Sequence, residues 1–412
     1  MQKKLLTAAV AGALAAPSVA LAQVEVYGFI SVAVQNFRYS ESASGAASIS
    51  KIDVSTHGSN YGVRGRETLG GGLTAWFQIE QNAPMQRSNN VAITPASRNT
   101  AVGFQGAWGN AFIGQWTTPW SDLESLWSVG AVGGYSPSLS IIGRRETTGT
   151  APNPNCVNGH LSGGQPPGVG FTVVGGVTGV ATAIVCDNVE SGGGVGHAFW
   201  RRFSDAVFYQ SPVFGGVQIK LAYMSNEGKS NGAAGTIQAD PQAYSASVQW
   251  AGMGGRLRVG AAYDGHKDFT TPGQTDSGWR VVGGWNFGFA DIGGAYEQMT
   301  YKTAAGDVDA LQWGVALAVP IGQGAIRASY AKADDLETPA GTTDTGAYFW
   351  TIGYDYRLSK RTQVGVGYAV IENDPGAIFT WTGAPPNQTG TGLAPLPGSD
   401  PSTLFISVIH RF

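Results

Sequence analysis

The sequence predicts an all-β protein, a sixteen-stranded antiparallel transmembrane β-barrel with a long inward-folded loop after its fifth strand. Three observations predict this fold. Apolar residues alternate with small or polar residues along most of the chain, which is the period of a pleated strand. The connections between these segments are alternately short and long. Only 13% of the 412 residues are charged, while 61 are glycine and 11% are aromatic, against about 25% charged and about 7% glycine in typical soluble domains.

The first 22 residues have the pattern of a secretory signal peptide. Lys3 and Lys4 precede an apolar stretch over 5–16, and Ala20 and Ala22 form a small-x-small cleavage site. The alternative, a membrane-anchoring helix, requires about 20 apolar residues, more than this stretch offers. We therefore expect a signal peptide over 1–22 and a barrel over 23–412. No later segment holds 18 consecutive apolar residues, and the mean hydropathy is -0.05. An inserted product must therefore be a barrel.

Sixteen segments show the two-residue alternation. In the first, Val24 and Val26 alternate with Glu25 and Tyr27. The predicted strands are 24–37, 59–66, 73–82, 98–106, 110–116, 202–210, 217–226, 242–250, 256–264, 278–287, 290–301, 309–319, 325–333, 347–357, 361–371 and 402–412. The second row of each strand is mostly Gly, Ala, Ser, Gln and a few arginines, which suits a water-filled lumen of limited width. The sheet must close, because unpaired backbone groups are costly in hydrocarbon, and sixteen strands leave an aqueous channel.

The connections favour an outer-membrane barrel, in which tight turns lie at one end and long loops at the other. The tight turns are predicted at 68–72, 107–109, 211–216, 251–255, 288–289, 320–324 and 358–360. The long loops are predicted at 40–58, 83–97, 265–277, 334–346 and 372–401, and they are rich in Gly, Pro, Ser, Thr and Asp. An even number of strands places both chain ends on one side of the membrane.

The connection over 117–201 is far too long for an ordinary loop. An inserted domain would explain it, but its Gly and Pro content favours a segment that folds into the lumen and constricts it. Its start has helix-like spacing of apolar residues, and we expect these to pack against the inner wall: Trp120, Leu123, Leu126, Trp127 and Val129. Cys156 and Cys186 lie in this segment, and export to an oxidising compartment favours a disulfide between them over two unpaired thiols.

Several motifs, taken together and in order, resemble the trimeric general diffusion porins of Gram-negative bacteria, particularly the betaproteobacterial branch. They are Val26-Tyr27-Gly28, the hairpin from Tyr61 to Leu73, Ala101-Val102-Gly103-Phe104, Gly109 to Gly114, Tyr209 to Gly216, and the final strand Ile406 to Phe412. The resemblance implies a homotrimer in the outer membrane, in contact with the lipid bilayer and lipopolysaccharide. It also implies that the terminal Phe412 is the signal recognised by the outer-membrane assembly machinery.

The same resemblance implies a constriction between wall arginines and acidic residues of the third loop, which is the long connection over 117–201. The matching arginines are Arg98 and Arg202, and a third family arginine falls on Asn60. Asp122 matches an acidic position at the start of the loop and Glu124 follows it, whereas Ser128 and Val132 replace acidic residues of the loop tip. On the fourth strand, the family register implies that Val102 and Phe104 face inward and that Ala101 and Gly103 face a neighbouring subunit.

Basic residues recur on the polar row of the predicted strands, where water would preserve their hydration. The candidates for pore lining are Arg64, Arg66, Lys220, Arg258 and Arg280. Arg327 and Arg357 share this pattern, and we expect many of these residues to pair with Glu25, Glu80, Asp264 or Asp355.

We therefore expect a porin-like, water-filled channel for passive diffusion of small hydrophilic solutes and ions. One alternative is a substrate-specific channel, in which Trp116, Trp120, Trp127 and Tyr135 form a track for one solute class. Another is an adhesin or phage receptor whose pore is incidental. An outer-membrane hydrolase is disfavoured, because the histidines lie in predicted loops or at a strand end: His57, His160, His197, His266 and His410.

The sequence points to no catalytic residues, cofactor or metal. Asp334 and Asp335 resemble a calcium or lipopolysaccharide-bridging pair, but solvated loop charges are the simpler reading. The net charge of -3 lacks the basic stripe that nucleic-acid binding requires.

Overall fold

The computed structural model describes residues 23–83, 85, 96–143, 199–224, 242–269, 273–303, 305–381 and 396–412, with the backbone of 156–157 and 160–161. Within these residues, no helix has the length and hydrophobicity needed to cross a membrane. The signal peptide at 1–22 lies outside the described residues, as do Cys186 and the side chain of Cys156. The cleavage site and the disulfide therefore stay predictions.

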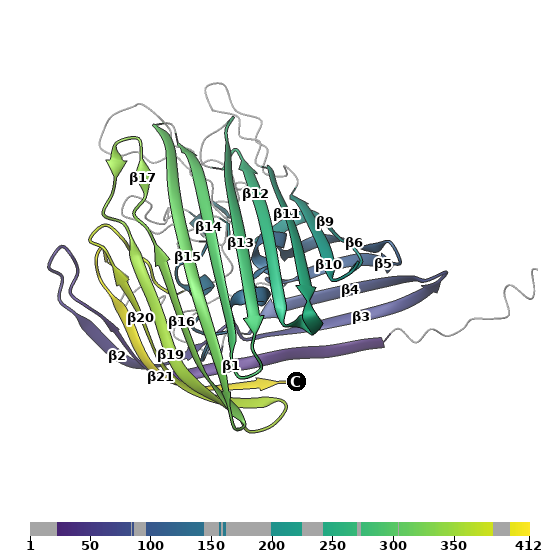
Figure 1. Cartoon of the computed structure of the whole chain (residues 1–412), viewed down its shortest axis with the longest axis horizontal. Helices are drawn as coiled ribbons and strands as arrows, with labels where there is room; N and C mark the ends of the chain where they lie inside the picture. The colour runs from purple at the N-terminus through teal and green to yellow at the C-terminus, as the bar shows by residue number, and fades with distance from the viewer. Residues whose placement is uncertain are drawn as a thin grey trace, which may run out of the picture.

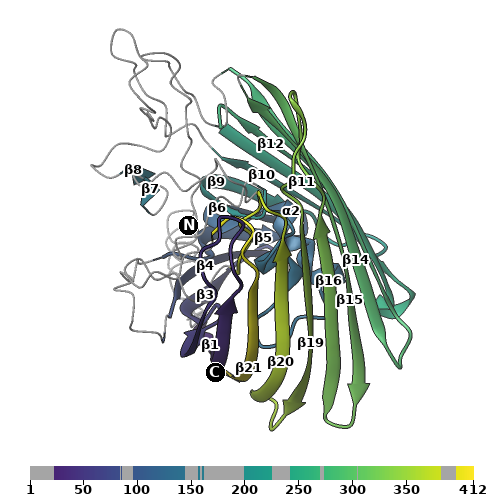
Figure 2. The same cartoon turned by 90° about the vertical axis from the view of Figure 1, so that its left-hand side faces the viewer.

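Sixteen long strands of the described chain form one closed antiparallel sheet (Figures 1 and 2). They are β1 (Gln23–Tyr39), β3 (Asn60–Gly70), β4 (Leu73–Asn82), β5 (Thr100–Gly106), β6 (Gly109–Thr117), β9 (Arg202–Gln210), β10 (Val217–Met224), β11 (Gln242–Gly252), β12 (Leu257–Lys267), β13 (Thr275–Asn286), β14 (Asp291–Thr303), β15 (Gly306–Ile321), β16 (Gly324–Ala333), β19 (Ala347–Arg357), β20 (Thr362–Asn373) and β21 (Pro401–Arg411). Each strand pairs with the next, and β21 pairs with β1 from Phe29↔Arg411 to Tyr39↔Pro401. The predicted barrel is confirmed, and the strand ends differ from the prediction by at most four residues.

Shorter strands lie in the long loops of the barrel. β2 (Ile49–Thr56) extends the pairing of β1 beyond the end of β3, and sequence analysis placed these residues in a loop. β17 (Glu337–Thr338) and β18 (Gly341–Thr342) form a small hairpin between β16 and β19. β7 (Cys156–Val157) pairs with β8 (His160–Leu161).

The first part of β1 and the end of β21 meet at the end of the barrel that carries the tight turns. The amide of Gly28 donates to the carbonyl of Phe412 at 3.2 Å, and the amide of Phe412 donates back at 3.1 Å. A Cβ at Gly28 would lie 2.4 Å from the carbonyl oxygen of Asn60, so only glycine allows this close approach. Backbone pairing at the last residue thus helps to close the sheet where β1 passes between β3 and β21.

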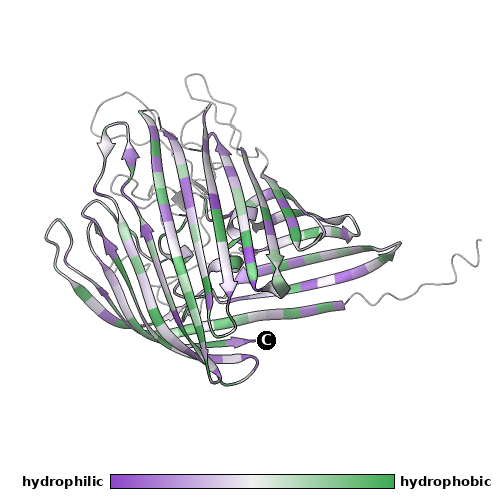
Figure 3. Ribbon diagram, in the orientation of Figure 1, coloured by the Kyte–Doolittle hydropathy of each residue, from purple (hydrophilic) through white to green (hydrophobic). Residues whose placement is uncertain are grey.

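Apolar and polar residues alternate along many of the strands, as the colours of Figure 3 show, and successive side chains of a strand point to opposite faces of the wall. The interior face is identified by its contact with the third loop, because Ser245 accepts a hydrogen bond from the Trp120 amide at 3.1 Å. On the exterior, large apolar side chains stay exposed, for example Val26, Ile113, Ile352 and Ile406. This exposed apolar surface is the surface that lipid covers in a transmembrane barrel.

The register expected for the fourth strand is wrong. In β5, Val102 and Phe104 are 51% and 49% exposed on the exterior, whereas Ala101 is buried and Gly103 faces Phe112 on the interior. The side-chain direction of Arg98 does not predict the directions of the residues in β5, because the chain bends at residues 98 and 99 and β5 begins at Thr100. The apolar alternation of β5 itself, rather than the register of the family, therefore gave the correct orientation.

The described part of the long connection, 118–143, lies along the interior face of the barrel. Thr118 caps α2 (Pro119–Asp122) by accepting from the amide of Ser121 at 3.2 Å, and α3 (Glu124–Trp127) follows directly. Trp120, Leu123 and Trp127 are fully buried in one cluster with alanines of the wall. The apolar start of the segment therefore packs against the inner wall, while most of 144–198 lies outside the described residues.

Small residues on the interior face make room for this segment. A Cβ at Gly293 of β14 would lie 1.9 Å from the carbonyl oxygen of Trp127, and one at Gly284 of β13 would lie 2.4 Å from that of Leu126. A Cβ at Gly278 would lie 2.8 Å from the ring of Phe199. The interpretation that small interior residues line a water-filled lumen is therefore wrong for this part of the wall, where they contact protein.

Candidate functional site: the lumen wall

The described part of the third loop, 118–143, covers one side of the lumen and does not reach the other side. From α2 onward, it contacts the interior faces of β10 to β16, and its tip reaches β19, β21 and β1. At that tip, Tyr135 packs on Phe405 with ring centroids 4.6 Å apart and donates to Gln35 of β1. Within the described residues, the interior face of β3 to β6 is the side that this segment does not cover.

Three interior arginines hold the loop rather than face open water. Arg258 donates to the carbonyl of Leu126 at 3.1 Å and pairs with Asp291. Arg280 donates to the carbonyl of Trp120 at 3.1 Å and pairs with Glu297 at 3.1 Å. Arg327 donates to the carbonyl of Val129 and pairs with Asp355 at 2.9 Å.

These contacts change the pore-lining prediction for two residues. Arg280 faces the interior, but its side chain is 0% exposed beneath α2, so the prediction that it lines the water-filled lumen is wrong. Arg258 lies on the same covered wall and keeps 18% of its side chain exposed. A loop carbonyl and a carboxylate contact each guanidinium, and a buried charge requires partners of this kind.

The two predicted constriction arginines lie where β5, β6 and β9 meet. Arg98 pairs with Glu80 of β4 at 2.7 Å and donates to Asn82 at 3.1 Å. Arg202 donates to Oδ1 of Asn99 at 2.7 Å. Asn99 also accepts from the amide and hydroxyl of Thr117 at 3.1 and 2.9 Å. The side chain of Asn99, just before β5, therefore joins the end of β6, where the third loop starts, to β9.

The two predicted acidic residues have different surroundings. Asp122 pairs with Lys220 of β10 at 3.2 Å. Burial raises the pKa of Asp122, while Lys220 and then Arg202 oppose the rise. Glu124 instead accepts from Ser138 of the loop itself; burial raises the pKa of Glu124, and Arg280 opposes the rise. The structure thus brings Asp122 to Lys220 and Arg202 of the wall but directs Glu124 toward Ser138 of the loop.

Arg64 and Arg66 of β3 lie on the uncovered wall, and both are exposed. Arg64 pairs with Glu25 of β1, and its guanidinium lies 4.7 Å from the centre of the Tyr27 ring. Tyr27 in turn donates to Glu80 at 2.9 Å. The expected partnerships of Glu25 and Asp355 with interior arginines are therefore present, and Glu80 pairs with Arg98 itself.

Sequence reasoning missed Asn99 and Tyr27, because nothing in the local sequence shows that their side chains bridge separate strands. The alternative in which aromatic residues of the third loop form a track for one solute class is also not supported. Trp120, Trp127 and Tyr135 are each 0% exposed, so they cannot contact a passing solute. Trp116 keeps partial exposure and packs against Trp76 of β4 instead, with ring centroids 5.7 Å apart.

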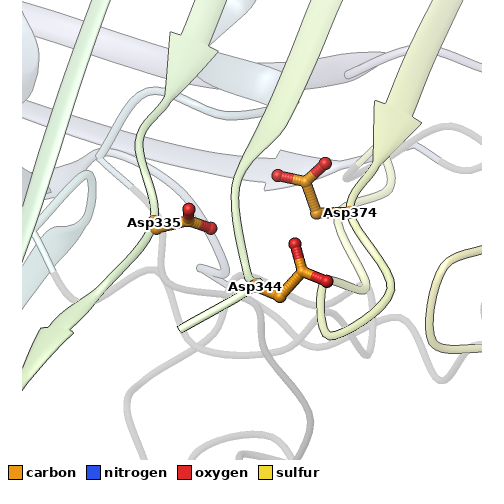
Figure 4. A group of neighbouring side chains, drawn as sticks. All are labelled: Asp335, Asp344 and Asp374. Atoms are coloured by element: carbon orange, nitrogen blue, oxygen red, sulfur yellow. The ribbon is translucent and has the colours of Figure 1, made fainter. Parts of the chain in front are cut away.

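Three acidic side chains gather at the loop end of the barrel, where Asp335, Asp344 and Asp374 have carboxylate oxygens within 4.8 Å of one another (Figure 4). Asp335 accepts from the amides of Thr345 and Gly346 at 2.7 and 2.8 Å. Burial, followed by Asp335 and Asp344, raises the pKa of Asp374. The group therefore lies where the β16–β19 connection meets the end of β20.

A closed transmembrane barrel with charged side chains on its interior face is the architecture of outer-membrane channel proteins. Residues 6–376 match the family model described as Gram-negative porin. The chain belongs to this family, the channel proteins of the Gram-negative outer membrane. Family membership confirms the resemblance drawn from the motifs and the outer-membrane location.

Individual relatives agree with the family. Outer membrane porin protein 32 of Delftia acidovorans is 24% identical over 381 residues, covering 90% of each chain. Major outer membrane protein P.IB of Neisseria gonorrhoeae is 30% identical over 153 residues, so the match spans 35% of this chain and 42% of that protein.

Solved structures share the fold. The anion-selective porin from Comamonas acidovorans has a TM-score of 0.63 at 20% identity, covering 95% of this chain and 100% of that chain. A trimer form of OmpT, an outer membrane protein of Vibrio cholerae, has a TM-score of 0.56 at 14% identity, covering 95% and 99%.

Proposed function

We propose that the protein forms a passive, water-filled diffusion channel for small hydrophilic solutes and ions, with a preference for anions. The observation that carries this proposal is the charge on the interior face beside the start of the third loop. Arg98, Arg202 and Lys220 lie there with Glu80 and Asp122, so basic side chains outnumber acidic ones among these five described residues. Burial raises the pKa of Asp122, which weakens the negative charge that opposes anions in this cluster. Fixed charges on low-dielectric walls set the local concentration of permeating ions.

Neither a cofactor nor a catalytic group is part of this proposal, and flow follows the concentration gradient. The anion preference printed for the Comamonas acidovorans porin is in line with the larger number of basic side chains in this cluster. The constriction is assigned to Arg98, Arg202 and Asp122. Glu124 is not assigned to it, because its carboxylate is held by Ser138.

We further propose a homotrimer, supported by the trimer form of a structural neighbour. The apolar exterior would contact lipid and neighbouring subunits, and the long loops would contact lipopolysaccharide. Phe412 remains our candidate for recognition by the assembly machinery, and its aromatic side chain is 44% exposed.

Conductance of the purified protein in planar bilayers tests the channel, and the reversal potential across a potassium chloride gradient tests its selectivity. Arg98→Ala leaves Glu80 without its partner, so we expect the anion-to-cation permeability ratio to fall by about two- to fivefold, the effect of one unit charge a few ångströms from a hydrated ion. Glu80→Gln should move the ratio in the opposite direction.

Lys360→Ala removes one charge from the exposed β19–β20 turn and should leave the reversal potential unchanged. A protein that inserts into the bilayer but never conducts would contradict the channel. Equal reversal potentials in the wild type, Arg98→Ala and Glu80→Gln would contradict the role of the charge cluster.

A further inference from the structure

Two tryptophans are partly exposed on the uncovered wall of the lumen. Trp76 of β4 and Trp116 of β6 meet edge to face, with ring centroids 5.7 Å apart and an interplanar angle of 71°. Trp76 lies on the interior face, because it pairs across the sheet with Gly103, which faces Phe112. The exposed part of each indole ring therefore belongs to the interior face of the wall.

The neighbouring rings fix the orientation of this pair. Phe112 lies 5.3 Å from Trp76 and 5.2 Å from Trp116, and it stacks on Phe208 at 4.9 Å with an interplanar angle of 5°. The indole nitrogen of Trp76 donates to Oδ1 of Asn110 at 2.8 Å. The platform is therefore pre-organised, which lowers the entropy that binding must overcome.

An available cation lies beside the platform. Arg66 of β3 is directly opposite Trp76 in the β3–β4 register, so their Cβ atoms are close neighbours on the same face. Arg66 is exposed. Arg64, Arg98 and Lys220 each have a carboxylate partner, whereas no ion pair joins Arg66 to another residue that the structure describes.

We propose that Trp76, Trp116 and Arg66 form a solute subsite for planar aromatic carboxylates in the lumen. The aromatic ring of the solute contacts the indole pair, where offset and edge-to-face arrangements are favourable, and its carboxylate contacts the Arg66 guanidinium, which presents paired donors to an anion. This inference rests on the proposed channel function and names a solute class for it. The fully buried Trp120 and Trp127 contribute no ring surface to the subsite.

Block of single-channel current by three small probes tests the subsite. Benzoate carries both features, cyclohexanecarboxylate has the same charge and nearly the same size without an aromatic face, and benzyl alcohol keeps the ring without the charge. In the wild type, we expect benzoate to reach half-block at a concentration about three- to tenfold lower than cyclohexanecarboxylate, the range of a single aromatic contact.

Variants assign each part of that preference. The double variant Trp76→Leu, Trp116→Leu should make benzoate and cyclohexanecarboxylate equal. Arg66→Gln should weaken both carboxylates while leaving benzyl alcohol unchanged, and because Arg66 is exposed this variant keeps the test available if the double variant does not fold. Trp279→Leu removes a 40% exposed tryptophan from the exterior of β13 and should behave as the wild type.

The outcomes separate the subsite from the channel. Equal half-block by benzoate and cyclohexanecarboxylate in a conducting wild type overturns the subsite and leaves the channel intact. A benzoate preference that survives in the folded double variant also overturns it. Loss of all potassium chloride conductance in the wild type overturns the channel itself.

Discussion

His57 makes a pH-sensitive contact with the tip of the third loop. It is 6% exposed, its ring meets Tyr135 at 4.9 Å, and its Nε2 lies 2.7 Å from the Ser55 hydroxyl. A Cβ at Gly134 of the loop would lie 2.5 Å from the Cβ of His57. Burial lowers the pKa of His57 from 6.5 to about 4. The docked loop therefore holds the neutral imidazole.

Acidification should loosen this contact. Because the pKa of His57 is lower in the docked state, the stabilisation is present above pH 6.5 and is lost progressively as the pH falls from 6.5 to about 4. The shift corresponds to on the order of 3 kcal/mol. We expect current fluctuations of single channels to increase over this range in the wild type.

His57→Phe should remove the dependence, because a phenyl ring does not titrate. His410→Asn changes a histidine at the exposed end of β21 and should retain it. Fluctuations in His57→Phe that rise with acidification as in the wild type would contradict the role of His57.

At the scale of the element, glycines of β13 and β14 decide where the third loop docks. A Cβ at Gly293 would lie 1.9 Å from the carbonyl oxygen of Trp127. A Cβ at Gly294, on the opposite face, would have its nearest neighbour at 3.4 Å. Gly293 thus has no room for a side chain, whereas the adjacent Gly294 has room for one.

Gly293→Val should displace α3 from the wall and cost about 1–3 kcal/mol through overpacking. We expect a lower denaturant midpoint and an altered single-channel conductance. Gly294→Val is the matched control and should leave both near the wild-type values. If the two variants have the same stability and conductance, the docking of α3 on β14 is wrong.

At the scale of the whole molecule, the exterior must match hydrocarbon over the full circumference of the barrel. Ile352 lies at the centre of β19 and is 50% exposed. Ile352→Arg should destabilise the folded barrel by about 2–4 kcal/mol, because an arginine at the bilayer midplane loses its hydration.

Tyr356→Arg, near the end of the same strand and 37% exposed, should cost about 0–1 kcal/mol, since the charge reaches the interface. Denaturant titration in lipid vesicles measures both free energies of unfolding. Equal costs at the two positions would show that the exterior of β19 does not face hydrocarbon.

The barrel could be predicted from sequence because its signal is local. Alternation repeats every two residues, turn residues stand between the strands, and closure follows from the need to pair every backbone group in lipid. Even on β5, where the family register was wrong, the local alternation of Val102 and Phe104 identified the exterior face. The strand positions, the outward apolar rows and the inward direction of Arg64, Arg66 and Lys220 all follow from this local pattern.

The environment of the interior side chains could not be predicted from the sequence, because it depends on contacts between residues far apart in the chain. Arg280 became a loop anchor only because α2 packs above it, and Arg98 and Asp122 found their partners on separate strands, in Glu80 and Lys220. The sequence by itself determined the wall of this protein, since the alternation within each strand shows which residues share a face. Only the tertiary structure decided which interior side chains meet solvent, because that depends on the path of the third loop across strands that the local sequence does not relate to it.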